Sequence, residues 1–174
     1  MICVLPFCYV FIRSFWTNSG ITFQSYYDVF LGSPQYLFRF WKSLGMSACI
    51  AAGQLVVSIL AGYGFAKYKF PGRAILFFLL MILMTLPVQV TLVPNFITLS
   101  NLGLLDSYAA LILPSIFVPL GTFILTQSFK SISESVLDAA MLDGCGVSRI
   151  LLLVAMPMNK SGIVCVLLLS FLDA

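Results

Sequence analysis

The sequence predicts an all-α protein, a polytopic bundle of helices that crosses a membrane several times. Its 174 residues are 61% hydrophobic and only 9% charged, whereas a soluble domain carries roughly a quarter charged residues. Residues 44–66 contain no charged side chain and are long enough to cross a bilayer as one helix. A short basic segment, 67–73, follows directly. Because so few charges cannot cover a water-facing surface, most of the surface is expected to face lipid.

Composition also excludes several classes of function. The chain has no His, the commonest proton-transfer residue and metal ligand. Its five Cys are scattered without a C-x-x-C pair, which argues against a zinc site or a redox motif. The sequence has no Lys/Arg block that could follow a nucleic-acid backbone and no G-x-x-x-x-G-K-[ST] loop for ATP. We therefore expect no metal, no cofactor, no nucleic-acid partner and no ATPase activity of its own.

The first 43 residues are expected to hold one partial helix and one loop. Residues 1–12 are apolar, but as a helix they reach only about 18 Å, against a hydrocarbon core of about 30 Å. We interpret them as the tail of a first spanning helix, with a short interfacial piece as the alternative. Helix breakers and many aromatic residues in 13–43 predict an extramembrane loop. A short interfacial helix is expected inside it, at about 23–30.

Residues 44–66 are predicted to span the membrane inside a bundle. The run is rich in Gly, Ala and Ser, and such small residues let helices approach closely in lipid. The segment 67–73 then carries three basic residues, no acid and a Pro71-Gly72 turn. Short positive loops stay in the cytoplasm, so this segment sets the orientation of the chain.

Two further spans are expected, at 74–99 and 109–127. The first is interrupted by Pro87 and Pro94, and the second contains Pro114 and Pro119. The connecting segment 101–108 has no basic residue, as expected for the outside face. Because two spans separate them, 130–149 is predicted to lie on the same cytoplasmic side as 67–73.

The C-terminal apolar run, 150–172, is predicted to be two elements. Lys160 lies near its centre, where a Lys costs roughly 2.5–3.5 kcal/mol on insertion scales. We therefore expect an interfacial helix at 150–156 and a span from Ser161 to the end. The whole chain, 1–174, is interpreted as a single transmembrane domain that is partial at both ends.

The segment 131–157 combines acids, small residues and glycines outside the apolar runs. Ser131 with Glu134, or Ser135 with Asp138, can form a capping box that begins a helix. Ala139 and Ala140 keep one surface thin enough for a partner's groove, and Gly144 allows a sharp turn. The alternative is an ordinary amphipathic helix that stops at a Gly. A catalytic pair of Asp138 and Asp143 is disfavoured, because nothing nearby would exclude water or supply a nucleophile.

A polar, Pro-broken patch lies within the span 74–99. Irregular backbone at membrane depth is tolerated where it lines a cavity or is buried in protein. Pro87, Thr91 and Asn95 are four residues apart and would share one helix face. We hypothesise that the patch borders a translocation path; the alternative is that its side chains bond neighbouring helices or the carbonyls freed by Pro. The patch consists of Thr85, Pro87, Gln89, Thr91, Pro94 and Asn95.

An ordered set of short motifs, spread over about 15–174, resembles the carbohydrate-uptake permeases of ABC importers of the maltose type. The central motif is similar to the EAA loop of that family, with Asp138 where Glu is usual, Ser133 where Pro is common and Met156 where Leu precedes Pro157. The Asp keeps the carboxylate but shortens its reach. The motifs are 61–67 (AGYGFAK), 70–73 (FPGR), 86–94 (LPVQVTLVP), 102–104 (LGL), 129–134 (FKSISE), 138–145 (DAAMLDGC) and Met156-Pro157.

The resemblance implies a permease subunit of an ATP-driven importer for sugars or related small polar solutes, in the cell inner membrane. Its partners would be two ABC ATPase subunits, a second permease and an extracytoplasmic solute-binding protein. The cytoplasmic coupling loop, about 130–157, would engage the ATPase. The coupling residues carried over are Glu134, Asp138, Ala139, Ala140, Asp143, Gly144 and Pro157.

Two other classes stay open from the residues alone. An ion-coupled secondary transporter or channel usually places an acid inside a span, whereas every acid here lies in a loop or at an end. A structural membrane subunit without a transport role is the third interpretation.

Overall fold

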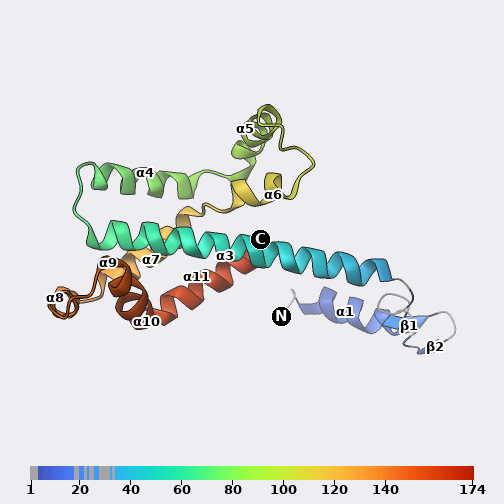
Figure 1. The fold of residues 1–174 in the computed structure, drawn as a ribbon. Helices are drawn as coiled ribbons and strands as arrows, with labels where there is room; N and C mark the ends of the chain where they lie inside the picture. Colours follow the sequence, from blue (N-terminus) through green and yellow to red (C-terminus); the bar gives the residue numbers. More distant parts are fainter. Residues whose placement is uncertain (1–3, 18–19, 22, 24–25, 28–31, 33) are drawn as a thin grey trace. The chain divides into compact units, whose positions relative to one another are not determined.

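A computed structural model describes residues 4–17, 20–21, 23, 26–27, 32 and 34–174. Figure 1 shows that the described chain is almost entirely helical, which confirms the predicted all-α class. The exception is one antiparallel pair of two-residue strands, β1 (Trp16–Thr17) and β2 (Gly20–Ile21). The chain divides into two compact units, Met1–Gly45 and Met46–Ala174.

The first unit is organised around aromatic side chains. Helix α1 (Leu5–Ser14) begins with a Pro in its first turn, where a missing N–H costs nothing. After it, the ring of Phe15 lies 5.5 Å from that of Phe23 and 5.1 Å from that of Tyr26. The Ser14 hydroxyl is 2.7 Å from the Tyr26 hydroxyl. Of the interfacial helix predicted at 23–30, most residues lie outside the described part of the chain.

Helix α3 (Pro34–Lys67) begins at Pro34 rather than at residue 44, so the predicted loop over 34–43 is wrong. Pro fits the first turn of a helix, and no further Pro or Gly follows before Gly45. Nothing in this stretch therefore stops the helix. Within the described ranges, Gln35–Lys67 is the one continuous helix long and apolar enough to cross a membrane. Three further pairs of helices are each bent at a short break, and counting each pair as one span gives up to four spans.

The span predicted at 74–99 is two helices, α4 (Arg73–Thr85) and α5 (Val88–Asn101), bent by 104°. Pro87 forces the preceding Leu86 into an extended conformation, with ψ at 125°. The interruption predicted at Pro87 is thus confirmed. The one at Pro94 is wrong, because Pro94 lies inside α5. Its fixed φ suits a helix, so α5 continues past it, at the cost of one backbone bond and of crowding between the Pro94 ring and the Val90 carbonyl.

The next predicted span is also bent, by 41°, between α6 (Tyr108–Ser115) and α7 (Pro119–Lys130). A helix running through this point would pair the Ser115 carbonyl with the N–H four residues later. That residue is Pro119, which has no N–H. The side chain of Gln54, on α3, donates its Nε2 hydrogen to the Ser115 oxygen at 2.7 Å instead. Gln54 is 2% exposed, so this bond replaces the missing backbone bond inside the protein.

We expect Gln54→Ala to lower the free energy of unfolding by about 1–3 kcal/mol, because the Ser115 carbonyl loses its donor. Gln127→Ala is the matched control, because it removes an amide side chain of the same kind from an exposed position on α7. It should change the free energy of unfolding by less than about 0.5 kcal/mol. Thermal unfolding in detergent measures both. Equal losses in the two variants would show that the Gln54 bond does not support the break.

Helix α7 is the centre of the second unit, with α4 and α11 (Lys160–Asp173) packed against it. Helix α3 approaches it closely at Gly62, where a Cβ atom would lie 2.9 Å from that of Leu125. At Gly121, on α7, a Cβ atom would lie 2.7 Å from the Ser58 hydroxyl of α3. The prediction that small residues of 44–66 let this helix pack closely against a neighbour is therefore confirmed.

The chain after α7 folds into short helices before α11. The predicted division of 150–172 is confirmed: the segment Val147–Met158 meets Lys160–Asp173 at 85°. Asn159, at the bend, is 6% exposed, and its Oδ1 accepts a hydrogen bond of 2.9 Å from the Ser128 hydroxyl. The short elements are α8 (Glu134–Leu142), α9 (Val147–Arg149), the π-helix η2 (Ile150–Ala155) and α10 (Met156–Met158).

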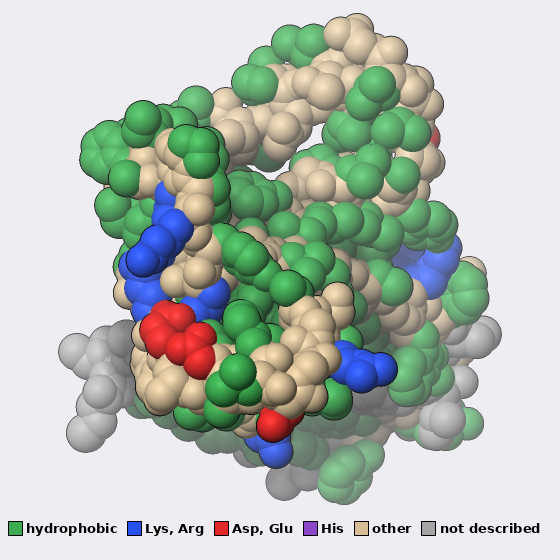
Figure 2. All heavy atoms as spheres, turned by 60° about the vertical axis from the view of Figure 1, so that its left-hand side comes forward, with side chains coloured by type: hydrophobic (Ala, Val, Ile, Leu, Met, Phe, Trp, Pro, Cys, Tyr) green, Lys and Arg blue, Asp and Glu red, His purple; other side chains and the backbone are tan. Residues whose placement is uncertain are grey.

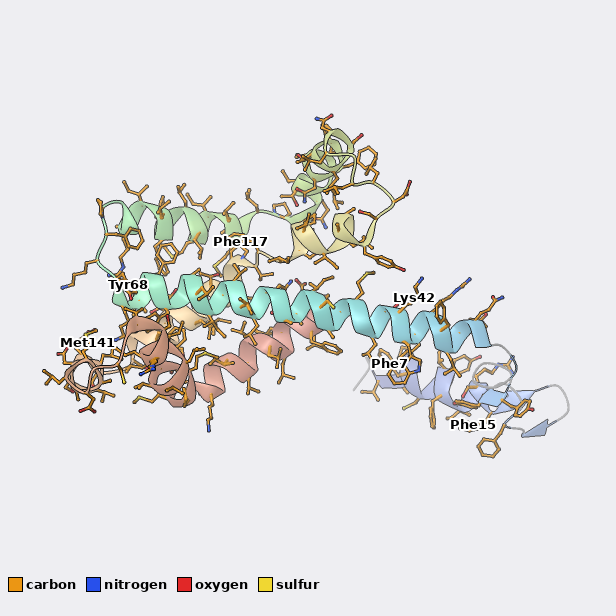
Figure 3. The ribbon with its side chains drawn as sticks, viewed as in Figure 1. Phe7, Phe15, Lys42, Tyr68, Phe117 and Met141 are labelled. Atoms are coloured by element: carbon orange, nitrogen blue, oxygen red, sulfur yellow. The ribbon has the colours of Figure 1, made fainter. Side chains whose placement is uncertain are left out.

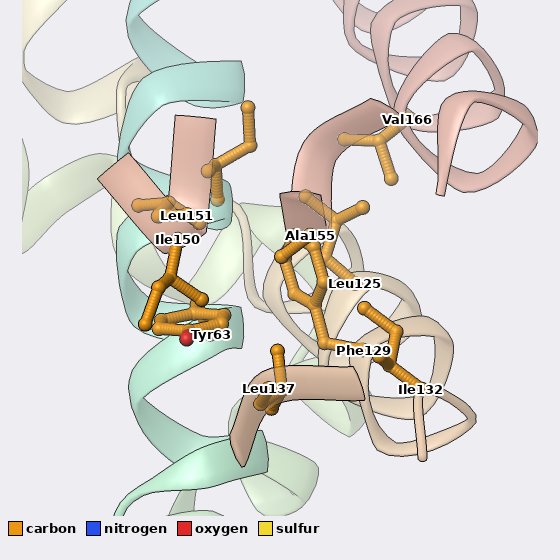
Figure 4. Close-up of a cluster of buried hydrophobic side chains, with 10 residues drawn as sticks. Tyr63, Leu125, Phe129, Ile132, Leu137, Ile150, Leu151, Ala155 and Val166 are labelled. Atoms are coloured by element: carbon orange, nitrogen blue, oxygen red, sulfur yellow. The ribbon is translucent and has the colours of Figure 1, made fainter. Parts of the chain in front are cut away.

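One apolar cluster joins these elements to the long helices, as Figure 4 shows. Its centre is Phe129, 0% exposed, whose ring meets that of Tyr63 edge-on at 5.6 Å. Helices α3, α7, α8, α11 and η2 all contribute. The cluster consists of Ile59, Tyr63, Leu125, Phe129, Ile132, Leu137, Ile150, Leu151, Ala155 and Val166.

Candidate functional site

The predicted coupling loop is a small folded unit rather than an open loop. Helix α8 packs against η2, and its Leu137 is 3% exposed. Figure 4 shows Leu137 pointing into the cluster that also holds Ile150 and Tyr63. Burying a Leu side chain contributes about 1.5–3 kcal/mol, enough to hold a helix of nine residues in place. Leu137 therefore anchors α8 to the core.

The opposite side of α8 is exposed. Residues 135, 138, 139 and 142 follow the i, i+3, i+4, i+7 spacing of a single helix face, and all four are exposed. We call Ser135, Asp138, Ala139 and Leu142 the outer face of α8. Leu142 is 89% exposed, and Met141 beside it is 55% exposed (Figure 3). A large apolar side chain presented next to a carboxylate and a thin Ala surface is suited to contact with another protein.

Gly144 ends α8 in the way the sequence predicted. Its φ of 78° lies in the left-handed region, which favours Gly. The N–H of Gly144 donates to the Met141 oxygen at 3.0 Å, and that of Cys145 donates to the Ala140 oxygen at 3.1 Å. This pair of bonds is a Schellman motif. Ala140 and Cys145 also pack together against the core cluster, so the C-terminal end of α8 is fixed.

Lys67, at the end of α3, fixes the other end of α8. Its Nζ donates to the Ile132 oxygen at 2.7 Å and lies 3.1 Å from Oε1 of Glu134. The Lys67 side chain is 6% exposed and that of Glu134 is 74% exposed. These contacts place 67–73 and 130–149 at the same end of the second unit, as predicted.

The predicted capping box is wrong. The residue before α8 is Ser133, whose side chain makes no capping bond. The Ser131 hydroxyl donates back to the Ser128 oxygen at 2.7 Å, and the Ser135 hydroxyl lies 3.2 Å from that of Ser133. Glu134 is the first residue of α8, and it reaches Lys67 instead of a backbone N–H. Glu134 therefore pairs with Lys67 of α3 instead of forming the predicted capping box.

We expect Lys67→Met to destabilise the loop by about 1–3 kcal/mol, because the Ile132 carbonyl loses a buried donor. Glu134→Gln should cost less than about 1 kcal/mol, since the Glu134 side chain is 74% exposed and water screens its attraction to Lys67. Thermal unfolding of the purified protein compares the two. A larger loss for Glu134→Gln would contradict this ranking.

The structure separates the predicted coupling residues into groups. Asp138 and Ala139 lie on the outer face, Ala140 is half-buried, and Asp143 with Gly144 forms the exposed turn. Pro157 lies apart from them, exposed in α10, on the far side of η2. The anchors Lys67 and Leu137 were missed by sequence reasoning. The period of the helix alone could have found Leu137, but Lys67 lies 65 residues from Ile132 along the chain.

Of the predicted translocation residues, Thr85 and Pro87 lie at the break between α4 and α5, and the other four lie within α5; all six are exposed. The Thr85 hydroxyl donates to the Ile82 oxygen at 2.7 Å, and the Thr91 hydroxyl donates to the Val88 oxygen at 2.8 Å. Both hydroxyls are therefore used inside their own helices. Gln89 and Asn95, on α5, carry the exposed amide groups of the set.

Comparison with known proteins identifies the class to which this helical chain belongs. The chain belongs to the family described as binding-protein-dependent transport system inner membrane component, whose model matches residues 54–174. The match includes the end of α3, the predicted coupling loop and α11. The resemblance stated from the sequence motifs is thereby confirmed.

Curated relatives are sn-glycerol-3-phosphate transport system permease proteins. The UgpE protein of Yersinia pestis bv. Antiqua (strain Antiqua) is 33% identical over 131 residues, which is 75% of this chain and 47% of the relative. That of Brucella abortus (strain 2308) is 29% identical over 132 residues, 76% of this chain and 47% of the relative. The chain thus spans about half the length of the curated relatives it matches.

A solved structure shares the fold. It is the crystal structure of a bacterial ABC transporter involved in the import of the acidic polysaccharide alginate, with a TM-score of 0.68 and 24% sequence identity. The match covers 77% of this chain and 49% of that chain. The part of the chain that this match covers therefore has the fold of an ABC transporter membrane subunit.

Proposed function

We propose that the chain is part of the membrane-spanning permease subunit of an ATP-driven importer, and that the outer face of α8 is its contact with the ATPase. The observation that carries the proposal is the contrast between the two sides of one short helix. Leu137 is 3% exposed in the core, while Leu142 is 89% exposed on the other side. Leu142 and the neighbouring Met141 together expose an apolar surface at the end of α8, which suits burial against a partner.

The anchoring of α8 suits it to transmit movement. Lys67 and Leu137 tie the helix to α3 and to the core, and the Schellman motif fixes its C-terminal end. A force applied to the outer face therefore moves a rigid body rather than bending a loop. We propose that closure of two ATPase subunits on ATP moves α8 and, through α3 and η2, the spanning helices.

The chain itself is proposed not to hydrolyse ATP, because it has no phosphate-binding loop. The proposed partners are two ABC ATPases, a second permease and an extracytoplasmic solute-binding protein. Family membership supports this assembly. The matched relatives are named for sn-glycerol-3-phosphate, and the matched structure for alginate import. We propose a sugar or a related small polar solute as the substrate.

The end that carries Lys67 and α8 is proposed to be cytoplasmic, with the subunit crossing the cell inner membrane several times. Segment 67–73 has three basic residues and no acid, and short positive loops stay in the cytoplasm. An ATPase would meet α8 on that side.

Uptake by vesicles that contain the complete transport system tests the energy source. Substrate should accumulate when ATP is inside the vesicles, and accumulation should persist when a protonophore collapses the ion gradients. Uptake that needs a gradient and not ATP would favour the secondary transporter instead.

We also propose that Gln89 and Asn95 border the translocation path. Replacing both by alanine is expected to raise the KM for uptake at least about fivefold, because each lost hydrogen bond to substrate is worth about 1 kcal/mol. Gln127→Ala is the control, since it removes an exposed amide from α7. Unchanged KM and unchanged substrate preference in the double variant would disprove the assignment.

A further inference from the structure

A hollow lined by basic and aromatic side chains lies beside the turn between α3 and α4. Its volume is about 560 Å³. Among the described residues that line it, none is acidic. Figure 2 shows a group of Lys and Arg side chains on this face of the molecule, with acidic side chains next to it. The lining consists of Phe65, Lys69, Phe70, Gly72, Arg73, Ala74, Ile75, Phe77 and Lys130.

The three cations reach the hollow from different elements. Lys69 lies in the turn and is exposed; Arg73 begins α4 and is half-buried; Lys130 ends α7. Arg73 Nη2 donates to the Ala66 oxygen at 3.4 Å, and Lys130 Nζ lies 5.1 Å from the centre of the Phe77 ring. The carboxylate of Glu134 pairs with Lys67, which is not among the residues that line the hollow. The positive charge at the hollow therefore has no carboxylate in its lining to neutralise it.

The rest of the wall is apolar. The Phe65 ring lies 6.0 Å from that of Phe70 and 5.7 Å from that of Phe77. From the hollow, α4 continues with exposed apolar side chains, among them Ile75 at 67% and Phe78 at 57%. The cations at the mouth suit the phosphate of a phospholipid, and the exposed apolar side chains along α4 suit its acyl chains.

We propose that this hollow binds the phosphate group of an anionic phospholipid of the cytoplasmic leaflet, with the acyl chains lying along α4. The phosphate chemistry alone would also suit a soluble phosphate ester. The position favours lipid: this inference rests on the proposed cytoplasmic orientation, which places Arg73, the first residue of α4, at the membrane surface where anionic headgroups lie. Each basic residue near the membrane surface strengthens such binding roughly fivefold.

Native mass spectrometry of the purified full chain tests the site directly. The probes are phosphatidylglycerol and phosphatidylcholine of equal chain length, added in detergent. We expect at least tenfold tighter binding of phosphatidylglycerol. The triple variant K69Q/R73Q/K130Q should lose this preference. K160Q, which removes an exposed Lys outside the hollow, should keep it.

A soluble competitor distinguishes the two sources of phosphate. An excess of sn-glycerol-3-phosphate should not displace phosphatidylglycerol, because it offers nothing to the apolar wall. Displacement at equimolar concentration would overturn the lipid assignment, as would equal binding of the two lipids or full retention of the preference in the triple variant. If the triple variant fails to fold, the single change Lys69→Gln, at an exposed position in the turn, should still weaken phosphatidylglycerol binding roughly fivefold; no change would overturn the proposal.

Discussion

Replacing Leu137 by alanine is expected to lower the stability of the second unit by about 2–5 kcal/mol, the range for removing a buried Leu side chain. Leu137 is 3% exposed and is the residue of α8 that enters the core cluster. The cavity would lie between α8 and η2, so the loop should loosen first. Thermal unfolding in detergent gives the overall loss, and hydrogen exchange of 134–142 gives the local one.

Leu142→Ala is the matched control, because it deletes the same atoms from a side chain that is 89% exposed. The free energy of unfolding of this variant should stay within about 0.5 kcal/mol of that of the unchanged protein. If the two variants unfold at the same temperature, α8 is not anchored through Leu137.

The second large effect is expected from Leu142→Asp. A charge at Leu142, the last residue of α8 and of its outer face, would have to be buried without a partner when an ATPase binds. Loss of a hot-spot residue of an interface costs about 2 kcal/mol or more, or roughly thirtyfold in affinity. Copurification of the ATPase should be lost, while the helical signal in circular dichroism stays unchanged, because the side chain touches no core residue.

Val147→Asp provides the comparison. Val147 is 53% exposed and lies beyond the Gly144 turn, on α9. The same apolar-to-acid change there should leave most of the ATPase bound. An equal loss in both variants would mean that the contact is not centred on the outer face of α8.

Much of this architecture could be predicted because local signals were strong. The apolar runs identified helices, the Pro87 break identified the bend, and Gly144 identified the end of α8. These features depend on residues close together in the chain. Lys160 likewise marked the division at 150–172, since a charge is costly inside a span.

The errors arose where a distant residue decided the outcome. Glu134 had a plausible local partner for a capping box, yet Lys67 of α3 binds it. Gln54 donates to the Ser115 carbonyl, 61 residues away along the chain, in place of the missing backbone N–H. The start of α3 at Pro34 was missed because aromatic residues in 34–43 suit an interfacial loop as well as a helix. Tertiary pairing of this kind leaves no periodic signal in a sequence.

Crosslinking from the outer face tests the central claim most directly. A photoreactive amino acid at position 142, activated in native membranes, should link the chain to a protein with a phosphate-binding loop, and the yield should change when ATP is trapped. The same probe at position 164 on α11, which is exposed in this unit, should not. Adducts at position 142 that contain lipid or other membrane proteins but never an ATPase would contradict the account.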